Sequence, residues 1–272
     1  MSTAPTDIEA LKARIRDTWT AGDFGVIAQQ VQDAEEELIG RLPITPGLKV
    51  LDVACGTGNT AIPTARRGAD VIGVDIAPNL IEQARARAQA EDLGARFQEG
   101  DAEQLAFDDG TFDLVISVFG AMFGPRPERV AAEMTRVCRS GGRIVMANWT
   151  PDSFAGQSFR LSSRYVPPPQ GVPPPTLWGD EATVRERLRQ GISKLECHRR
   201  IATFRLPFSE SEVVDYYRRY FGPTIRLFEA LDAAQQQAYR KDFEALWKAN
   251  NRATDGTLSV PTEFLEVIAT RA

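Results

Sequence analysis

The sequence LKVLDVACGTGN, residues 48–59, carries the clearest signal of the fold. Its first seven residues form a short, largely apolar run of the kind that suits a strand buried in a parallel sheet. Gly56 and Gly58 then permit a tight turn and let the backbone come close to a ligand. A helix beginning near Asn59 would add the unpaired N–H groups of its first turn. The stretch therefore predicts a strand, a ligand-binding turn and a helix.

The same alternation continues toward the C-terminus. Strands are expected at residues 70–75, 95–100, 112–118 and 142–148, with helices at 78–90 and 127–138 between them. Parallel neighbours need crossover connections, so this order predicts a doubly wound, Rossmann-like α/β sheet. Two further strands are expected at residues 194–206 and 263–269.

The regions outside this core have patterns of their own. Helical spacing at residues 7–41, interrupted at 21–23, predicts two helices before the first strand. Residues 165–175, YVPPPQGVPPP, must be extended or polyproline II, and a stiff surface connector is favoured over a peptide ligand. Three more helices are expected at residues 180–190, 210–221 and 232–251.

Composition excludes several classes of protein. The 272 residues are 43% hydrophobic and 25% charged, as in ordinary globular chains, and the net charge of −5 argues against a nucleic-acid backbone as partner. Three irregularly spaced cysteines form no disulfide framework and favour a reducing compartment. The sequence has no signal-peptide pattern and no run of about 20 apolar residues, so a soluble, cytoplasmic protein is expected.

Acidic residues are predicted at successive strand ends. Asp75 lies nineteen residues after Gly56, where a carboxylate can accept both hydroxyls of a ribose. Residues 99–103, EGDAE, place a further acid at the next strand end, within reach of an adenine amino group. Residues 56–61, GTGNTA, also satisfy the dinucleotide pattern G-x-G-x-x-A, which alone is a weak signal.

Asp52, inside the first strand, helps to distinguish a dinucleotide from other adenosine-containing ligands. Its charge would be awkward beside a pyrophosphate, whereas it suits a cationic amine or a sulfonium. No Arg or Lys is expected to converge on the same site. The residues thus favour a ligand that carries a positive centre and no phosphates.

Four segments in order, VLDVACGTGNTAI, VIGVDIAPNLIEQAR, FQEGDAEQLAFDDGTFDLVIS and RVCRSGGRIVMANW, resemble a class I S-adenosylmethionine-dependent methyltransferase. The similarity covers about residues 48–149 and is greatest to the small-molecule branch that includes ubiquinone and menaquinone biosynthesis enzymes. It implies a seven-stranded, mostly parallel sheet whose last strand, FLEVIAT, is antiparallel. The expected regions are an N-terminal helical lid (1–46), the cofactor-binding core (47–150), a helical and proline-rich insertion on the acceptor side (151–261) and a closing strand (262–272).

The resemblance also implies roles for residues. The methionine portion of S-adenosylmethionine would be lined by Asp52, Ala54, Gly56 and Gly58. The ribose would be held by Asp75, and the adenine would be contacted by Ile76, Asp101 and Ala102. The sulfonium would be flanked by Ser117, Val118 and Phe119.

The acceptor side is less defined by the sequence. Candidate lid and wall residues are Trp19, Phe24, Ile27, Met122, Phe123, Trp178, Tyr216, Tyr217, Tyr220 and Phe221, for several of which plain core packing is an equal alternative. Residues 117–124 lack the Asn/Asp-Pro-Pro-aromatic element of enzymes that methylate DNA bases or glutamine side chains. Between residues 178 and 226, ten Arg or Lys against seven Asp or Glu suggest either an anionic acceptor or a solvated helix face.

No catalytic acid or base can be named from the sequence. The single histidine, His198, is expected on a late strand away from the crevice, and one His with three scattered Cys cannot make a typical zinc site. The expected function is transfer of a methyl group from S-adenosylmethionine to O, C or N of a small organic acceptor. The alternatives are a nicotinamide-dependent oxidoreductase and a non-catalytic binder of S-adenosylmethionine.

Overall fold

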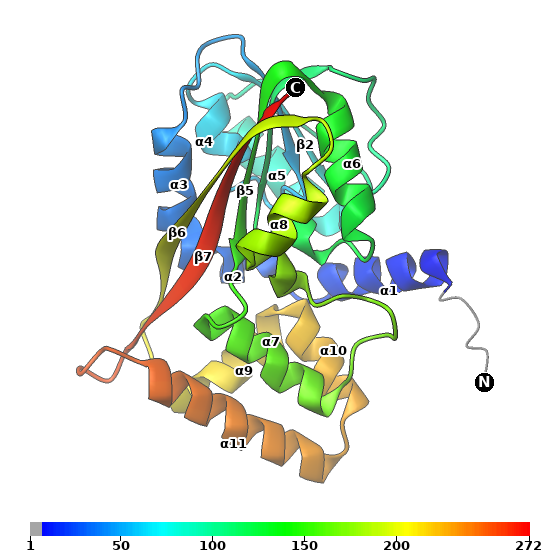
Figure 1. Ribbon diagram of the computed structural model, residues 1–272. Coiled ribbons are helices and arrows are strands. Elements are labelled where there is room, and N and C mark those ends of the chain that lie inside the picture. The colour runs from blue at the N-terminus through cyan, green and yellow to red at the C-terminus, as the bar shows by residue number, and fades with distance from the viewer. Residues whose placement is uncertain (1–6) are drawn as a thin grey trace, which may run out of the picture.

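A computed structural model describes residues 7–272 and shows a seven-stranded sheet (Figure 1). The strands, in their order across the sheet, are β3 (Arg96–Glu99), β2 (Asp70–Asp75), β1 (Lys49–Val53), β4 (Phe112–Val118), β5 (Cys138–Trp149), β7 (Leu258–Arg271) and β6 (Ile192–Leu206). Neighbours among the first five are parallel, and β7 is antiparallel to both β5 and β6. The predicted seven-stranded, mostly parallel sheet is confirmed.

Helices cover both faces of the sheet (Figure 1). On one side lie α3 (Gln32–Arg41) and α4 (Ala61–Ala65), and on the other lie α6 (Pro127–Val137) and α8 (Glu181–Arg187). The helix α5 (Pro78–Ala90) connects β2 to β3. Because β1 is covered on both faces, Val50, Leu51 and Val53 are fully buried, as expected for the centre of a parallel sheet.

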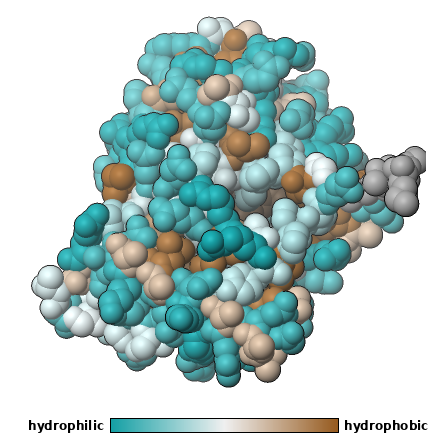
Figure 2. Space-filling model, turned by 60° about the horizontal axis from the view of Figure 1, so that its bottom comes forward, coloured by the Kyte–Doolittle hydropathy of each residue, from teal (hydrophilic) through white to brown (hydrophobic). Residues whose placement is uncertain are grey.

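A layer of helices lies beyond the carboxyl ends of the parallel strands (Figure 1). It consists of α7 (Phe154–Tyr165), α9 (Glu210–Tyr220), α10 (Gly222–Ala230) and α11 (Ala233–Asn250). Apolar residues of these helices form a second hydrophobic cluster with the ends of β6 and β7. Figure 2 shows this end of the molecule, where hydrophilic residues cover most of the face and apolar residues appear in separate small patches. The layer therefore turns its apolar side inward.

The N-terminal helices α1 (Ile8–Thr20) and α2 (Phe24–Ala28) join the sheet to the helical layer. Asp7 caps α1 by accepting hydrogen bonds from the N–H groups of Glu9 and Ala10. The N–H of Asp23 donates to the carbonyl of Tyr220 at 3.0 Å, which fixes the turn between α1 and α2 against α9. The second predicted helix is not continuous, because a 3-10 turn, η1 (Gln29–Val31), separates α2 from α3.

Other element boundaries also depart from the prediction. The strands β5 and β7 are longer than expected, and the helix expected near residue 59 begins only at Ala61. Residues 166–174 contain neither helix nor strand, as the prolines predict, but Tyr165 belongs to α7. The helix α10 was not predicted, since Gly222 and Pro223 suggest a break. The 3-10 turn η2 (Ala121–Phe123) follows β4, and η3 (Pro175–Gly179) precedes α8.

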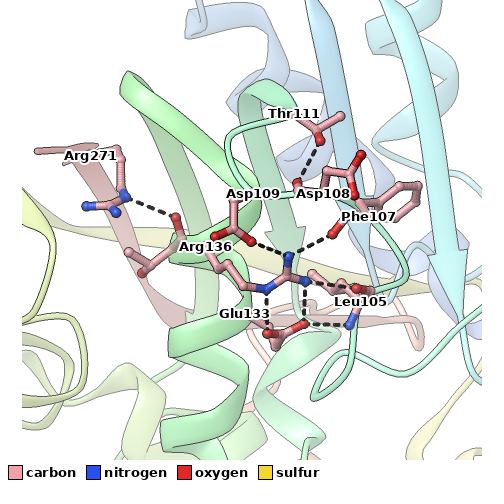
Figure 3. A network of polar contacts seen from close by, with 9 residues as sticks. Leu105, Phe107, Asp108, Asp109, Thr111, Glu133, Arg136 and Arg271 are labelled. Atoms are coloured by element: carbon pink, nitrogen blue, oxygen red, sulfur yellow. Dashed lines mark hydrogen bonds and ion pairs between the residues drawn. The ribbon is translucent and has the colours of Figure 1, made fainter.

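A polar network holds the loop between β3 and β4 in place (Figure 3). Arg136 of α6 donates to the carboxylate of Glu133 and to the carbonyl oxygens of Leu105 and Phe107. Glu133 in turn accepts the N–H of Leu105 at 2.7 Å. The network fixes the segment that follows the tip of β3.

None of the described helices is long and apolar enough to cross a membrane.

Candidate functional site

The tips of β1 and β4 have unusual backbone conformations. Ala54, with φ 55°, and Phe119, with φ 56°, adopt the left-handed region that residues with a Cβ rarely occupy. A Cβ on the next residue, Gly120, would lie 2.3 Å from the carbonyl oxygen of Ala54. The two strand tips therefore touch, and glycine is required where they do. Backbone strain of this kind gathers at ligand-binding sites.

Asp75 ends β2 beside the glycine turn and is 7% exposed. One carboxylate oxygen accepts the N–H of Gly56 at 2.8 Å, and the other accepts the N–H of Ala77 at 2.9 Å. Burial raises its pKa, while these backbone N–H groups oppose the rise. The carboxylate is thus fixed in orientation at the carboxyl end of β2.

Asp101 lies after the tip of β3 and is paired with a lysine. The Nζ of Lys12, from α1, lies 2.5 Å from Asp101 and 3.0 Å from Glu103. The expectation that no basic residue converges on the site is therefore wrong. Lys12 comes from a helix distant in sequence, and its charge is balanced by two carboxylates.

Asp52 lies deeper than the other two aspartates and is 1% exposed. Its Oδ2 accepts a hydrogen bond from the hydroxyl of Thr60, and its Oδ1 has no partner among the described residues. Burial raises the pKa of Asp52 to about 7. Thr60, rather than Asp52, lines the open space at the tip of β1.

A cavity runs from these strand tips into the helical layer. At the strand tips its lining includes Lys12, Ile15, Glu35, Ala54, Cys55, Gly56, Thr57, Asn59, Thr60, Asp75, Ile76, Leu80, Gly100, Asp101, Ala102, Val118, Phe119, Gly120 and Ala121. This half of the cavity is therefore lined largely by the backbone of the strand tips and by carboxylate side chains.

The other half of the cavity is mainly aromatic. Its aromatic lining comprises Trp19, Phe24, Phe123, Trp149, Phe154, Phe159, Phe204, Tyr217, Phe221, Phe243 and Trp247. The rings contact one another: Phe119 stacks on Trp149 with centroids 3.7 Å apart, and Trp19 meets Phe123 edge to face at 4.9 Å. Within the described residues, this half contains no Arg, Lys or His.

Most of the residues singled out from the sequence line this one cavity. Those that do are Ala54, Gly56, Asp75, Ile76, Asp101, Ala102, Val118, Phe119, Trp19, Phe24, Ile27, Phe123, Tyr217 and Phe221. Those that do not are Asp52, Gly58, Ser117, Met122, Trp178, Tyr216 and Tyr220.

The residues outside the lining have structural partners. The hydroxyl of Ser117 accepts the N–H of Ala121 at 2.9 Å, and that of Tyr216 donates to the carbonyl of Val26 at 3.2 Å. Met122 and Trp178 are buried in the main hydrophobic core. Gly58 faces Ile62 and Phe97, away from the lining.

Several lining residues were not identified from the sequence. Among them are Lys12, Glu35, Asn59 and Thr60 at the strand tips, and Trp149, Phe154, Phe159, Phe204, Phe243 and Trp247 in the aromatic half. The basic residues between 178 and 226 lie outside the lining, so their excess says nothing about the ligand. His198 is exposed on β6, away from the cavity as expected. In residues 7–272, no group of His, Cys, Asp or Glu side chains could hold a metal ion.

Comparison with known proteins identifies the family. The family model described as "Methyltransferase domain" matches residues 50–142. The uncharacterized protein Rv1405c of Mycobacterium tuberculosis is 34% identical over 260 residues, which cover 95% of each chain. The demethylmenaquinone methyltransferase of Deinococcus radiodurans is 39% identical over 128 residues, or 46% of this chain and 53% of that protein.

A solved structure agrees at the level of the fold. A putative methyltransferase from Bacillus halodurans superposes with a TM-score of 0.58 at 20% identity, and the match covers 88% of this chain and 98% of that one. The seven-stranded, mostly parallel sheet with its antiparallel last strand is the one that the sequence resemblance predicts. This chain belongs to the class I S-adenosylmethionine-dependent methyltransferases, and it resembles the enzymes of quinone biosynthesis.

Proposed function

We propose that the protein transfers a methyl group from S-adenosylmethionine to an oxygen, carbon or nitrogen atom of a small, largely apolar organic acceptor. The observation that supports this is the continuity of one cavity from the acidic strand tips to an aromatic chamber. Such a cavity can hold a nucleoside and an acceptor end to end. The N-terminal region, proposed as residues 1–46 and described by the structure from residue 7, would act as a lid, and residues 151–261 would supply most of the acceptor side.

The residues present fit the cofactor. Asp75 presents a fixed carboxylate toward the cavity, as ribose hydroxyls require, and Ile76 offers an apolar side chain beside it. Asp101 and Ala102 lie at the next strand tip, where an adenine would follow. Gly56, with φ 53°, keeps the backbone of the turn open to the amino-acid portion. Asp52 lies beneath the cavity lining and would act on the amino-acid portion through its hydrogen bond with Thr60.

The chain contributes mainly by positioning and by excluding water. When bound, S-adenosylmethionine supplies a methyl carbon already activated by its sulfonium. The acceptor atom would bond to that carbon as the carbon–sulfur bond breaks, its electron pair would stay on sulfur, and the acceptor would lose its proton to water. Holding the two reactants in line can itself lower the barrier by about 7–11 kcal/mol. Val118, Phe119 and Trp149, which line the cavity, would form the wall beside which the two meet.

The aromatic half supports an apolar or aromatic acceptor. It contains no basic residue among those described, which disfavours an anionic acceptor. The buried Nε1 of Trp247, which lines this half, has no hydrogen-bond partner among the described residues. That N–H could donate to an oxygen atom of the acceptor. The quinone-type substrates named for the demethylmenaquinone methyltransferases belong to this chemical class.

The acceptor class is tested by following S-adenosylhomocysteine release with a panel of compounds. We expect turnover with phenols, quinols or other apolar aromatics, and none with sugar phosphates or small carboxylates. Phe159→Ala should raise KM for the apolar acceptor and leave S-adenosylhomocysteine affinity within about twofold, because Phe159 lines only the aromatic half. Turnover restricted to charged acceptors would contradict the proposal.

A further inference from the structure

One carboxyl group in the cavity takes no part in the cofactor contacts proposed above. Glu35, on α3, is 6% exposed and lines the cavity, and its Oε2 has no hydrogen-bond partner among the described residues. No Arg or Lys forms a salt bridge with it in the described chain. Leaving a carboxyl oxygen buried without a hydrogen-bond partner is costly, so the presence of Glu35 here needs an explanation.

The neighbours of Glu35 place it at the β1 end of the cavity. Asn59 is within hydrogen-bonding range, and Asp52 from β1, Arg87 from α5 and Glu36 from α3 itself are the charged groups that act on it. Arg87 does not neutralise it, since its Nη1 donates to the carbonyl of Thr57 at 2.7 Å and to Oδ1 of Asn59 at 2.6 Å. Burial raises the pKa of Glu35 to about 8.

Two buried carboxyl groups therefore lie at the same end of the site, Glu35 in the cavity lining and Asp52 beneath it. Glu35 approaches from the N-terminal helices and Asp52 from the sheet, and each has one oxygen without a partner among the described residues. The ribose and adenine positions lie over β2 and β3, at Asp75 and Asp101, so the part of the ligand over β1 is the amino-acid portion. A cationic group placed there would neutralise the charge that burial otherwise disfavours.

We propose that Glu35 is a positioning residue that accepts a hydrogen bond from the α-ammonium group of the methionine portion of the cofactor. The proposal rests on the proposed function, because it takes the nucleoside to lie over β2 and β3. It makes α3 part of the cofactor site, so that binding of the amino-acid portion fixes the N-terminal helices against the sheet.

The test compares two ligands that differ in the amino-acid portion. S-adenosylhomocysteine carries the α-ammonium group, whereas 5′-methylthioadenosine lacks the whole amino-acid portion. Calorimetric titration of Glu35→Gln should show at least tenfold weaker binding of S-adenosylhomocysteine and less than twofold change for 5′-methylthioadenosine. Glu36→Gln is the matched control, since Glu36 is the exposed neighbour on the same helix and should change neither affinity.

A second measurement uses the wild-type protein. At pH 7, S-adenosylhomocysteine should release a proton from the protein on binding, seen as a dependence of the binding enthalpy on the ionisation enthalpy of the buffer. The release should be absent with 5′-methylthioadenosine. Equal weakening of both ligands by Glu35→Gln, or equal proton release with both, would overturn the role assigned to Glu35. Failure of the wild type to bind either ligand would instead contradict the proposed function.

Discussion

The carboxylate of Asp75 is already oriented by two backbone N–H groups before any ligand is considered. Asp75→Ala removes the acceptor for the ribose hydroxyls, and hydrogen bonds to a charged group contribute about 1.5–3 kcal/mol. We expect S-adenosylhomocysteine to bind at least tenfold more weakly in calorimetry. Asp70→Ala, at the exposed start of the same strand, is the control. Unchanged affinity of Asp75→Ala for S-adenosylhomocysteine would contradict the proposal that Asp75 binds the ribose hydroxyls.

Gly120 is the residue at which the two strand tips meet. A Cβ there would lie 2.3 Å from the carbonyl oxygen of Ala54, so Gly120→Ala must push the tips apart. We expect a lower melting temperature and loss of detectable S-adenosylhomocysteine binding. Gly94→Ala has no atom within 4 Å of the new methyl group and should behave as the wild type. Wild-type binding by Gly120→Ala would mean that the tips can separate without cost.

Glu35 should make the stability of the ligand-free protein depend on pH. Its pKa is raised from 4.5 to about 8 by burial, so the folded state keeps a proton that the unfolded state loses. The free energy of unfolding then falls as pH rises from about 4.5 to about 8, by up to about 1.4 kcal/mol per pH unit.

Urea denaturation of the ligand-free protein between pH 5 and pH 8 measures this dependence. Glu35→Gln removes the contribution of Glu35 and should give a visibly shallower decline, while the raised pKa of Asp52 leaves a part of it. Glu36→Gln should reproduce the wild-type decline. Equal slopes for Glu35→Gln and wild type would show that Glu35 titrates normally.

At the scale of elements, two basic residues attach α1 to the sheet through ion pairs that differ in burial. Lys12 has an 11% exposed side chain and contacts Asp101 and Glu103, whereas Arg16 and Glu99 are both nearly half exposed. Exposed pairs contribute about 0–1 kcal/mol, and removing one partner of a buried pair costs more. Lys12→Met should therefore loosen α1 more than Arg16→Met.

Hydrogen exchange of the amides in residues 8–20 checks this comparison. We expect Lys12→Met to speed exchange there clearly and Arg16→Met to leave it near the wild-type rate. Similar rates in the two variants would indicate that apolar contacts alone hold α1, for instance that of Trp19 with Phe123.

For the whole molecule, the sequence of the core was enough to predict the five parallel strands and many of the residues that line the cavity at the strand tips. Apolar strands, glycine turns and acidic strand ends all lie within residues 48–149, where local patterns carry the information. The aromatic half combines α2, α7, α9 and α11 with the ends of β5 and β6, and no local pattern links these segments.

Some of the missed residues left a signal that can be recognised afterwards. Glu35 interrupts the apolar stripe Val31, Leu38, Ile39 and Leu42 of the N-terminal helices, and a charge at such a position is a candidate for a buried function. Tyr239, Phe243 and Trp247 recur every four residues on α11, which predicts one buried face but does not say what it faces. Lys12 gave no such signal, because its partners are set by the packing of α1 on the sheet.

The most direct test of the account is calorimetric titration of the purified protein with S-adenosylhomocysteine and, in parallel, with NAD. The acidic strand tips and the cavity that follows them predict one binding site for S-adenosylhomocysteine and no detectable binding of NAD. Tighter binding of NAD than of S-adenosylhomocysteine would contradict it.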